Sequence, residues 1–84
     1  MKRLGIIGAG LIGASLVKFW SRRGTELVIV ETNVESHANL ADIAPQAHIQ
    51  KCIDSELSGC DLIVVAVPLG ACNDVFTHLA SVLT

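Results

Sequence analysis

A glycine-rich stretch near the amino terminus constrains the fold more than any other feature of the sequence. It reads Gly-Ala-Gly-Leu-Ile-Gly over residues 8–13, and it stands between an apolar run at residues 4–7 and a long apolar segment that begins at residue 11. This pattern predicts a buried strand, a tight turn and a helix. That arrangement is the one that cradles the pyrophosphate of a dinucleotide.

The residues of this stretch have separate physical roles. Gly8 permits the sharp turn out of the strand, Gly10 has no Cβ to hold backbone and phosphate apart, and Gly13 lets helix and strand pack closely. The backbone N–H groups of the first helical turn, which includes Leu11 and Ile12, have no acceptor within the helix and carry the positive end of its dipole. We therefore expect this turn to bind an anionic group.

Glu31 is the second candidate for cofactor binding. It ends an apolar run at residues 26–30 and follows Gly13 at close to the roughly 20 residues that separate the glycine turn from the acid on the adenosine ribose. A carboxylate can accept hydrogen bonds from both ribose hydroxyls, whereas a 2′-phosphate about 4 Å away would cost about 4 kcal/mol at an effective dielectric of 20. No Lys or Arg stands at residues 32–50 to receive such a phosphate. The sequence therefore predicts NAD rather than NADP.

Apolar runs and helical periodicities alternate along the whole chain. They predict strands at residues 2–7, 26–30, 48–53 and 61–67 and helices at residues 11–23, 34–43 and 71–82. The sheet-facing residues of the first two helices are expected to be Ile12, Leu16, Phe19 and Trp20, then Val34, Ala38, Ala41 and Ile43, with Asn33 as the cap of the second helix. The last helix is expected to carry Val75, Leu79 and Val82 along one face. The third strand is weak and is expected at the sheet edge, where Lys51 would discourage further pairing. The fold class is α/β, a three-layer Rossmann-like fold with a partial doubly wound parallel sheet in the order 3-2-1-4.

The composition and net charge indicate which classes of partner the chain is expected to bind. Hydrophobic residues make up 51% of the 84 residues and charged residues 17%, which suits a sheet covered on both faces. The net charge of −2, without a basic stripe, argues against nucleic acid or an anionic membrane surface as a partner. No apolar run is long enough for a membrane span and no cleavage pattern follows the amino terminus, so we expect a cytoplasmic protein.

Cysteine and histidine patterns predict neither a metal site nor a catalytic residue. The three cysteines, at residues 52, 60 and 72, form no CxxC and are expected to be small buried apolar residues in a reducing compartment. The three histidines lie in different segments, with no carboxylate or nucleophile that the sequence places beside them.

Two longer phrases carry a family resemblance. Gly-Ala-Gly-Leu-Ile-Gly-Ala-Ser-Leu at residues 8–16 and Cys-Asp-Leu-Ile-Val-Val-Ala-Val-Pro-Leu-Gly-Ala at residues 60–71 together resemble the N-terminal part of the prephenate and arogenate dehydrogenases of tyrosine biosynthesis. The resemblance covers nearly the whole chain. The sequence departs from it at Ala14, where the family often has glycine, and at Glu31, where it often has aspartate.

The resemblance implies an NAD-dependent oxidative decarboxylation of prephenate, in which a hydride leaves the ring carbon while carbon dioxide is lost. In that family the catalytic histidine and the substrate-binding arginines lie downstream of the matched region, so no catalytic residue is carried over. Residues 1–84 would then be the N-terminal part of a dinucleotide-binding domain, inactive without a catalytic domain outside this chain. The cofactor contacts that carry over are Gly8, Gly10, Gly13, the backbone of Leu11 and Ile12, Glu31, and a turn at Val67 and Pro68 beside the adenosine.

The predicted strand order leaves one edge open. A complete dinucleotide fold has the order 3-2-1-4-5-6, and only 3-2-1-4 fits this chain. Residues 62–67 would then form an exposed, uncharged, apolar edge, through which the chain either self-associates or continues into a longer protein. Two other functions stay open: the cofactor segment of another NAD-linked enzyme, such as a hydroxyacid or pyrroline carboxylate reductase, and a noncatalytic NAD(H)-sensing module.

Overall fold

Four parallel strands form the centre of the molecule. The computed structural model describes residues 2–8, 10–67 and 69–83. In chain order the elements are β1 (Arg3–Ile7), α1 (Leu11–Arg22), β2 (Glu26–Val30), the short 3-10 helix η1 (Val34–Ser36), α2 (His37–Ile43), β3 (His48–Gln50), a second 3-10 helix η2 (Ser55–Gly59), β4 (Leu62–Val65) and α3 (Leu69–Leu83).

The sheet has the order β3-β2-β1-β4, and every neighbouring pair is parallel. Ile7 at the end of β1 stands opposite Val30 of β2 and Val65 of β4, and Val30 stands opposite Gln50 of β3. The carboxyl ends of all four strands therefore meet at one end of the sheet. The predicted α/β class and the strand order 3-2-1-4 are confirmed.

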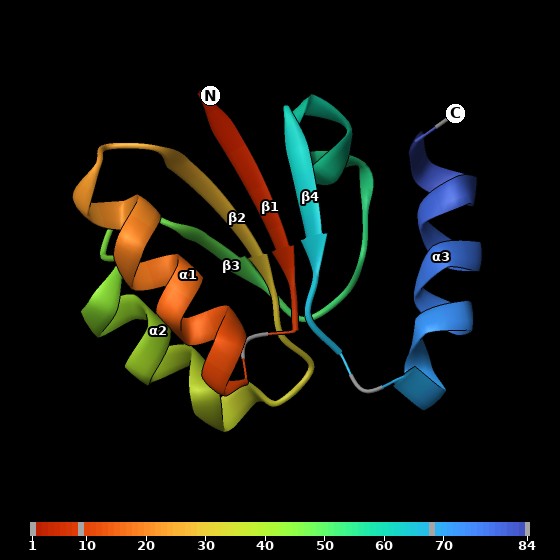
Figure 1. The fold of residues 1–84 in the computed structure, drawn as a ribbon, viewed down its shortest axis with the longest axis horizontal. Helices are drawn as coiled ribbons and strands as arrows, with labels where there is room; N and C mark the ends of the chain where they lie inside the picture. Colours follow the sequence, from red (N-terminus) through yellow and green to blue (C-terminus); the bar gives the residue numbers. More distant parts are fainter. Residues whose placement is uncertain (1, 9, 68, 84) are drawn as a thin grey trace.

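Helices cover the two faces of the sheet unequally. α1 and α2 lie together against one face, while η2 and α3 lie on the side of β4 (Figure 1). The described residues form two hydrophobic cores. Alternate residues of the central strands pack into one core or the other, because successive side chains of a strand point to opposite faces. The first core contains Leu4, Ile6, Val17, Leu27, Ile29, Leu40 and Ala44, and the second contains Ile7, Val28, Val30, Leu57 and Leu79.

The buried face of α1 differs from the prediction at Val17 and Phe19, and the side chain of Ile12, also predicted there, lies outside the described residues. Val17 is fully buried, and Leu16 and Trp20 pack against the first core. Phe19 is 48% exposed, so its predicted place on the sheet-facing stripe is wrong. Its ring instead lies under the guanidinium of Arg23, 4.4 Å from the ring centroid, where a cation–π contact occupies its exposed face.

The predicted inward face of the second helical segment is also wrong. Val34 is 58% exposed, and Ala38 and Ala41 are exposed as well, whereas Leu40 and Ala44 are buried. Val34 lies in the 3-10 turn at Val34–Ser36, before α2 begins, so it does not mark the inward face of that helix. Ile43 is 38% exposed and lies off that face as well. The predicted cap at residue 33 is confirmed, since the side chain of this asparagine accepts a hydrogen bond from the backbone N–H of Glu35.

The strands at the two edges are shorter than predicted. β3 ends at Gln50 and β4 spans only Leu62–Val65, with the side chain of Leu62 half exposed. In the described part of the chain β4 pairs with β1 alone, so it is an edge strand. The buried face predicted for the last helix is confirmed, with Leu79 buried and Val75 and Val82 packed against the second core.

Candidate functional site

The turn between β1 and α1 requires glycine at residue 8. Gly8 has a φ of +85°, and its N–H donates to the carbonyl oxygen of Val30 at 2.8 Å. A Cβ at this position would lie 2.6 Å from the carbonyl oxygen of Ala66 and 2.7 Å from Cγ1 of Val67. The chain can therefore make this turn, and bring β4 against it, only without a side chain here.

The amino terminus of α1 is left open toward a ligand. Gly10 caps the helix with an extended backbone and without a side-chain hydrogen bond, and its carbonyl accepts the first helical bond from the N–H of Ala14 at 2.8 Å. A Cβ built on Gly10 would meet nothing within 4 Å. The first-turn N–H groups, at Leu11, Ile12 and Gly13, have no acceptor within the helix. The geometry needed to receive an anionic group is present.

Glu31 follows β2 directly, and hydrogen bonds to its backbone and to its carboxylate hold it. Its N–H donates to the carbonyl of Gln50 at 2.8 Å, and its Oε2 accepts a hydrogen bond from the N–H of Asn33 at 2.9 Å. Nε2 of His37, at the start of α2, lies 2.7 Å from the carbonyl oxygen of Glu31. These contacts fix the loop that carries the carboxylate.

One cavity of about 600 Å³ lies at this carboxyl end of the sheet. Its described lining residues come from the ends of all four strands and from α3: Ile7, Gly8, Gly10, Val30, Glu31, Thr32, Lys51, Cys52, Ile53, Ala66, Val67, Ala71, Val75 and His78. Four of the predicted cofactor residues, Gly8, Gly10, Glu31 and Val67, thus face the same space. Residues 11–13 form the helical turn that follows Gly10, and Pro68 lies outside the described residues.

Sequence reasoning missed one wall of the cavity. Lys51, Cys52 and Ile53 follow β3, and His78 reaches the cavity from α3. The sequence could have indicated Lys51, Cys52 and Ile53, because the carboxyl ends of parallel strands lie at the same end of the sheet. The third strand was predicted to end at residue 53, but it ends at Gln50. The prediction therefore assigned these three residues to the strand and not to the loop that lines the cavity.

The cysteines and acids of the described residues form no metal site. Cys52 is exposed, so the prediction of a buried residue is wrong for it, while Cys60 and Cys72 are half buried. Burial raises the pKa of the Cys60 thiol, with Arg3 opposing this effect, so the thiol stays protonated at neutral pH.

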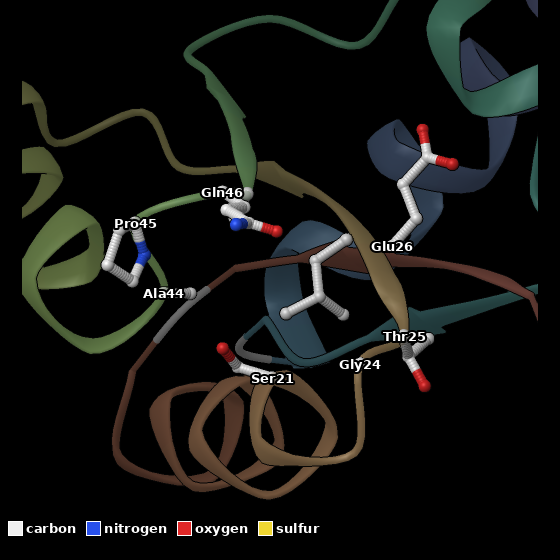
Figure 2. Close-up of a pocket in the computed structure, with 9 residues that line it drawn as sticks. Ser21, Gly24, Thr25, Glu26, Ala44, Pro45 and Gln46 are labelled. Atoms are coloured by element: carbon white, nitrogen blue, oxygen red, sulfur yellow. The ribbon is translucent and has the colours of Figure 1, made fainter.

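A second cavity, of about 410 Å³, lies at the opposite end of β2 (Figure 2). It is lined by Ser21, Gly24, Thr25, Glu26, Leu27, Ala44, Pro45, Gln46 and Ala47. It contains neither a glycine turn at the end of a strand nor a helix amino terminus. Its one ionised lining group, among the described residues, is Glu26, whose Oε1 lies 3.7 Å from Nε of Arg3.

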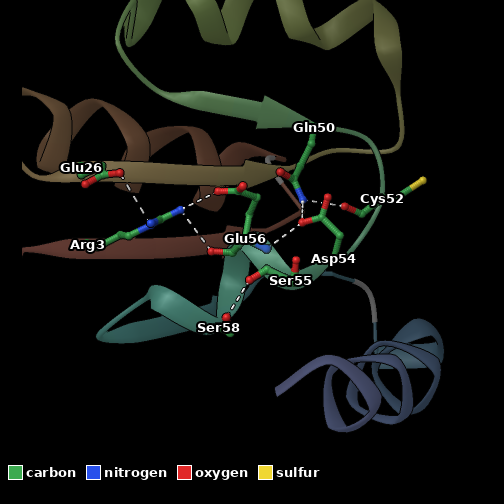
Figure 3. A network of polar contacts seen from close by, with 8 residues as sticks. All are labelled: Arg3, Glu26, Gln50, Cys52, Asp54, Ser55, Glu56 and Ser58. Carbon is green, nitrogen blue, oxygen red and sulfur yellow. Dashed lines mark hydrogen bonds and ion pairs between the residues drawn. The ribbon is translucent and has the colours of Figure 1, made fainter. Parts of the chain in front are cut away.

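Polar side chains hold the strands together at this amino end. Nη2 of Arg3 donates to Oε2 of Glu56 at 2.9 Å and to its carbonyl oxygen at 3.1 Å (Figure 3). Oδ2 of Asp61 accepts from the N–H groups of Lys2 and Arg3, at 2.8 and 3.0 Å, and these bonds lower the pKa of Asp61. These contacts tie β1 to η2 and to the residue that precedes β4.

Comparison with known families agrees with this geometry. The family model described as NADP oxidoreductase, coenzyme F420-dependent, matches residues 3–83. The chain belongs to this family. It is therefore an NAD(P)-binding, Rossmann-like domain of an oxidoreductase family, as the glycine turn predicts. A comparison with curated proteins finds no match. Among the described residues no helix is both long and apolar enough to cross a membrane.

Proposed function

We propose that the cavity at the carboxyl end of the sheet binds the adenosine and pyrophosphate parts of NAD, and that the chain is the cofactor-binding segment of a prephenate-type dehydrogenase. Bound NAD supplies the hydride acceptor of such a reaction. One observation carries the proposal: Gly8, Gly10 and Glu31, the residues expected to meet the pyrophosphate and the ribose, line a single cavity.

The glycine turn would receive the pyrophosphate. The space beside Gly10 is open where a Cβ would stand, so a phosphate can approach the backbone there. The first turn of α1 offers N–H donors and the positive end of a 12-residue helix. No charged side chain is needed for this contact, since the backbone itself supplies the donors.

Glu31 would receive the adenosine ribose. The contacts to Gln50, Asn33 and His37 hold its backbone and one carboxylate oxygen in place, which lowers the entropy lost when a ribose diol binds. A carboxylate accepts from both hydroxyls of the diol and repels a 2′-phosphate. This favours NAD within a family whose description names NADP.

The residues of this chain bind and orient the cofactor and do not carry out the chemistry. None of them matches the catalytic histidine or the substrate-binding arginines of the prephenate dehydrogenases, so we propose that these groups belong to another domain. The support for prephenate as the substrate is the resemblance at residues 8–16 and 60–71. Disruption of the gene that encodes the chain should then create a requirement for tyrosine, and unimpaired growth without tyrosine would contradict this substrate.

Calorimetric titration with NAD tests the cofactor proposal. We expect measurable binding that is weakened at least tenfold, or about 1.4 kcal/mol, in Glu31→Ala, because hydrogen bonds to an ionised carboxylate are lost. Glu35→Ala is the matched control, since it removes the same charge from an exposed position outside the cavity and should leave binding unchanged. A chain shown by circular dichroism to be folded, and yet unable to bind NAD, would overturn the proposal.

A further inference from the structure

Lys51 stands beside Glu31 at the mouth of the cavity. In the parallel register of β2 and β3, Val30 lies opposite Gln50, so the next positions along the two chains are Glu31 and Lys51. The hydrogen bond from the N–H of Glu31 to the carbonyl of Gln50 extends the pairing to this point. Neighbouring strands are about 4.8 Å apart, and both side chains line the cavity. One acidic and one basic residue, adjacent in the strand register, therefore line the same cavity.

The backbone around Lys51 is anchored on both sides. Nε2 of Gln50 donates to the carbonyl oxygen of Cys52 and to Oδ1 of Asp54, each at 2.8 Å (Figure 3). The same Oδ1 accepts from the N–H of Glu56 and so fixes the start of η2. The turn that carries Lys51 is therefore held in place next to the loop that carries Glu31.

The charges at the cavity mouth differ from those that the sequence predicts. Glu31 alone would exclude any ligand with a second phosphate on the ribose. Lys51 is the one Lys or Arg among the described lining residues, and it lies beside that carboxylate. A lysine is a flexible point charge that binds phosphate by charge-assisted hydrogen bonds.

We infer that Lys51 is a second specificity residue of this site, which receives the 2′-phosphate of a phosphorylated dinucleotide and offsets its repulsion by Glu31. The inference rests on the proposed function, since it needs the ribose at Glu31. The two residues have opposite effects on cofactor choice: Glu31 favours the free diol of NAD, and Lys51 lets NADP bind with lower affinity. The chain would then accept both cofactors and prefer NAD.

Fluorescence titrations with NADH and NADPH test the role of Lys51. We expect Lys51→Met to weaken NADPH binding about tenfold, because a charge-assisted contact is lost, and to leave NADH binding within about twofold. Lys18→Met is the matched control, since Lys18 is exposed on α1 and does not line the cavity, and it should change neither affinity. Glu31→Gln should shift preference the other way, with tighter NADPH binding and weaker NADH binding.

The possible outcomes separate this inference from the proposed function. If Lys51→Met weakens both cofactors equally, Lys51 contacts a part that they share, and the inference is overturned. It is also overturned if the NADH to NADPH affinity ratio is unchanged, or if the native chain binds NADH and shows no binding of NADPH. If the folded native chain binds neither cofactor, the proposed function fails and the inference fails with it.

Discussion

At the amino end of the sheet, charged side chains pair with one another and with backbone groups of the protein, whereas at the carboxyl end backbone groups and charges face a cavity. Arg3 contacts Glu26 and Glu56, and Asp61 accepts two backbone N–H groups. At the other end stand the glycine turn, the uncapped start of α1 and the charged residue Glu31. The cavities at these two ends have volumes of about 410 and 600 Å³, and they differ mainly in the groups that line them.

From this contrast we expect contacts at the amino end to determine mainly stability, and groups at the carboxyl end to determine cofactor binding. Contacts at the amino end tie β1 to β2 and η2, so their loss should lower stability and leave cofactor affinity unchanged. At the carboxyl end, substitution of the residues that line the cavity should change affinity, and at Gly8, where a Cβ would meet the backbone, it should change stability as well. Variants at the two ends can therefore show whether this division is real.

Gly8→Ala should have the largest effect. The added Cβ meets a backbone oxygen at 2.6 Å in a conformation with φ of +85°, and the close approach of β4 leaves it no room. We expect a loss of about 2 to 4 kcal/mol in the free energy of unfolding and a loss of NAD binding. Urea denaturation and calorimetry measure these quantities.

Gly70→Ala is the control for this substitution. Gly70 lies in α3, and a Cβ there meets nothing within 4 Å, so stability should rise by up to about 1 kcal/mol. An equal effect of the two substitutions would show that the turn at Gly8 is not as constrained as its geometry indicates.

Gly24→Ala should have a smaller effect, confined to stability. Gly24 follows α1 at the amino end with a φ of +76°, and a Cβ there has open space around it. We expect a loss of about 1 kcal/mol from backbone strain alone, with NAD affinity unchanged. Reduced NAD binding in a folded Gly24→Ala variant would break the proposed division between the two ends.

Asp61→Asn should lower stability at neutral pH and change how stability responds to acid. Hydrogen bonds from the N–H groups of Arg3 and Lys2 lower the pKa of Asp61 from its usual value of 3.8. Its contribution to stability is therefore present above that pH and is lost as the pH falls through the lowered pKa. Melting temperatures should show the variant less stable at neutral pH, with the difference shrinking as the pH falls below 3.8. Asp42→Asn, at an exposed site on α2, should not show this convergence.

The parts of the fold that depend on local sequence were predictable. Apolar runs marked β1 and β2, and the glycine spacing marked the turn at Gly8, because these features follow from backbone conformation and burial. Details that depend on individual side-chain hydrogen bonds were not predictable. The end of β3 depends on the amide of Gln50, which turns the chain toward Cys52 and Asp54, and this concealed the position of Lys51.

Self-association through residues 62–67 stays a prediction. β4 is an edge strand in the described part of the chain, with Leu62 half exposed and no charged residue within its span, Leu62–Val65. Such an edge pairs readily with another strand. Light scattering at increasing concentration should detect dimers or larger species, and Leu62→Lys, at the half-exposed residue of β4, should reduce them. A monodisperse monomer at high concentration would count against this pairing.

Chemical-shift mapping of the backbone amides during an NAD titration tests the central claim most directly. The carboxyl end should respond, with shifts at residues 7–8, 10–13, 31–32 and 51–53, and the amino-end cavity at residues 24–27 and 44–47 should not. Shifts confined to the amino-end cavity, or no saturable shifts in a folded sample, would contradict the assignment of the cofactor site to the carboxyl end of the sheet.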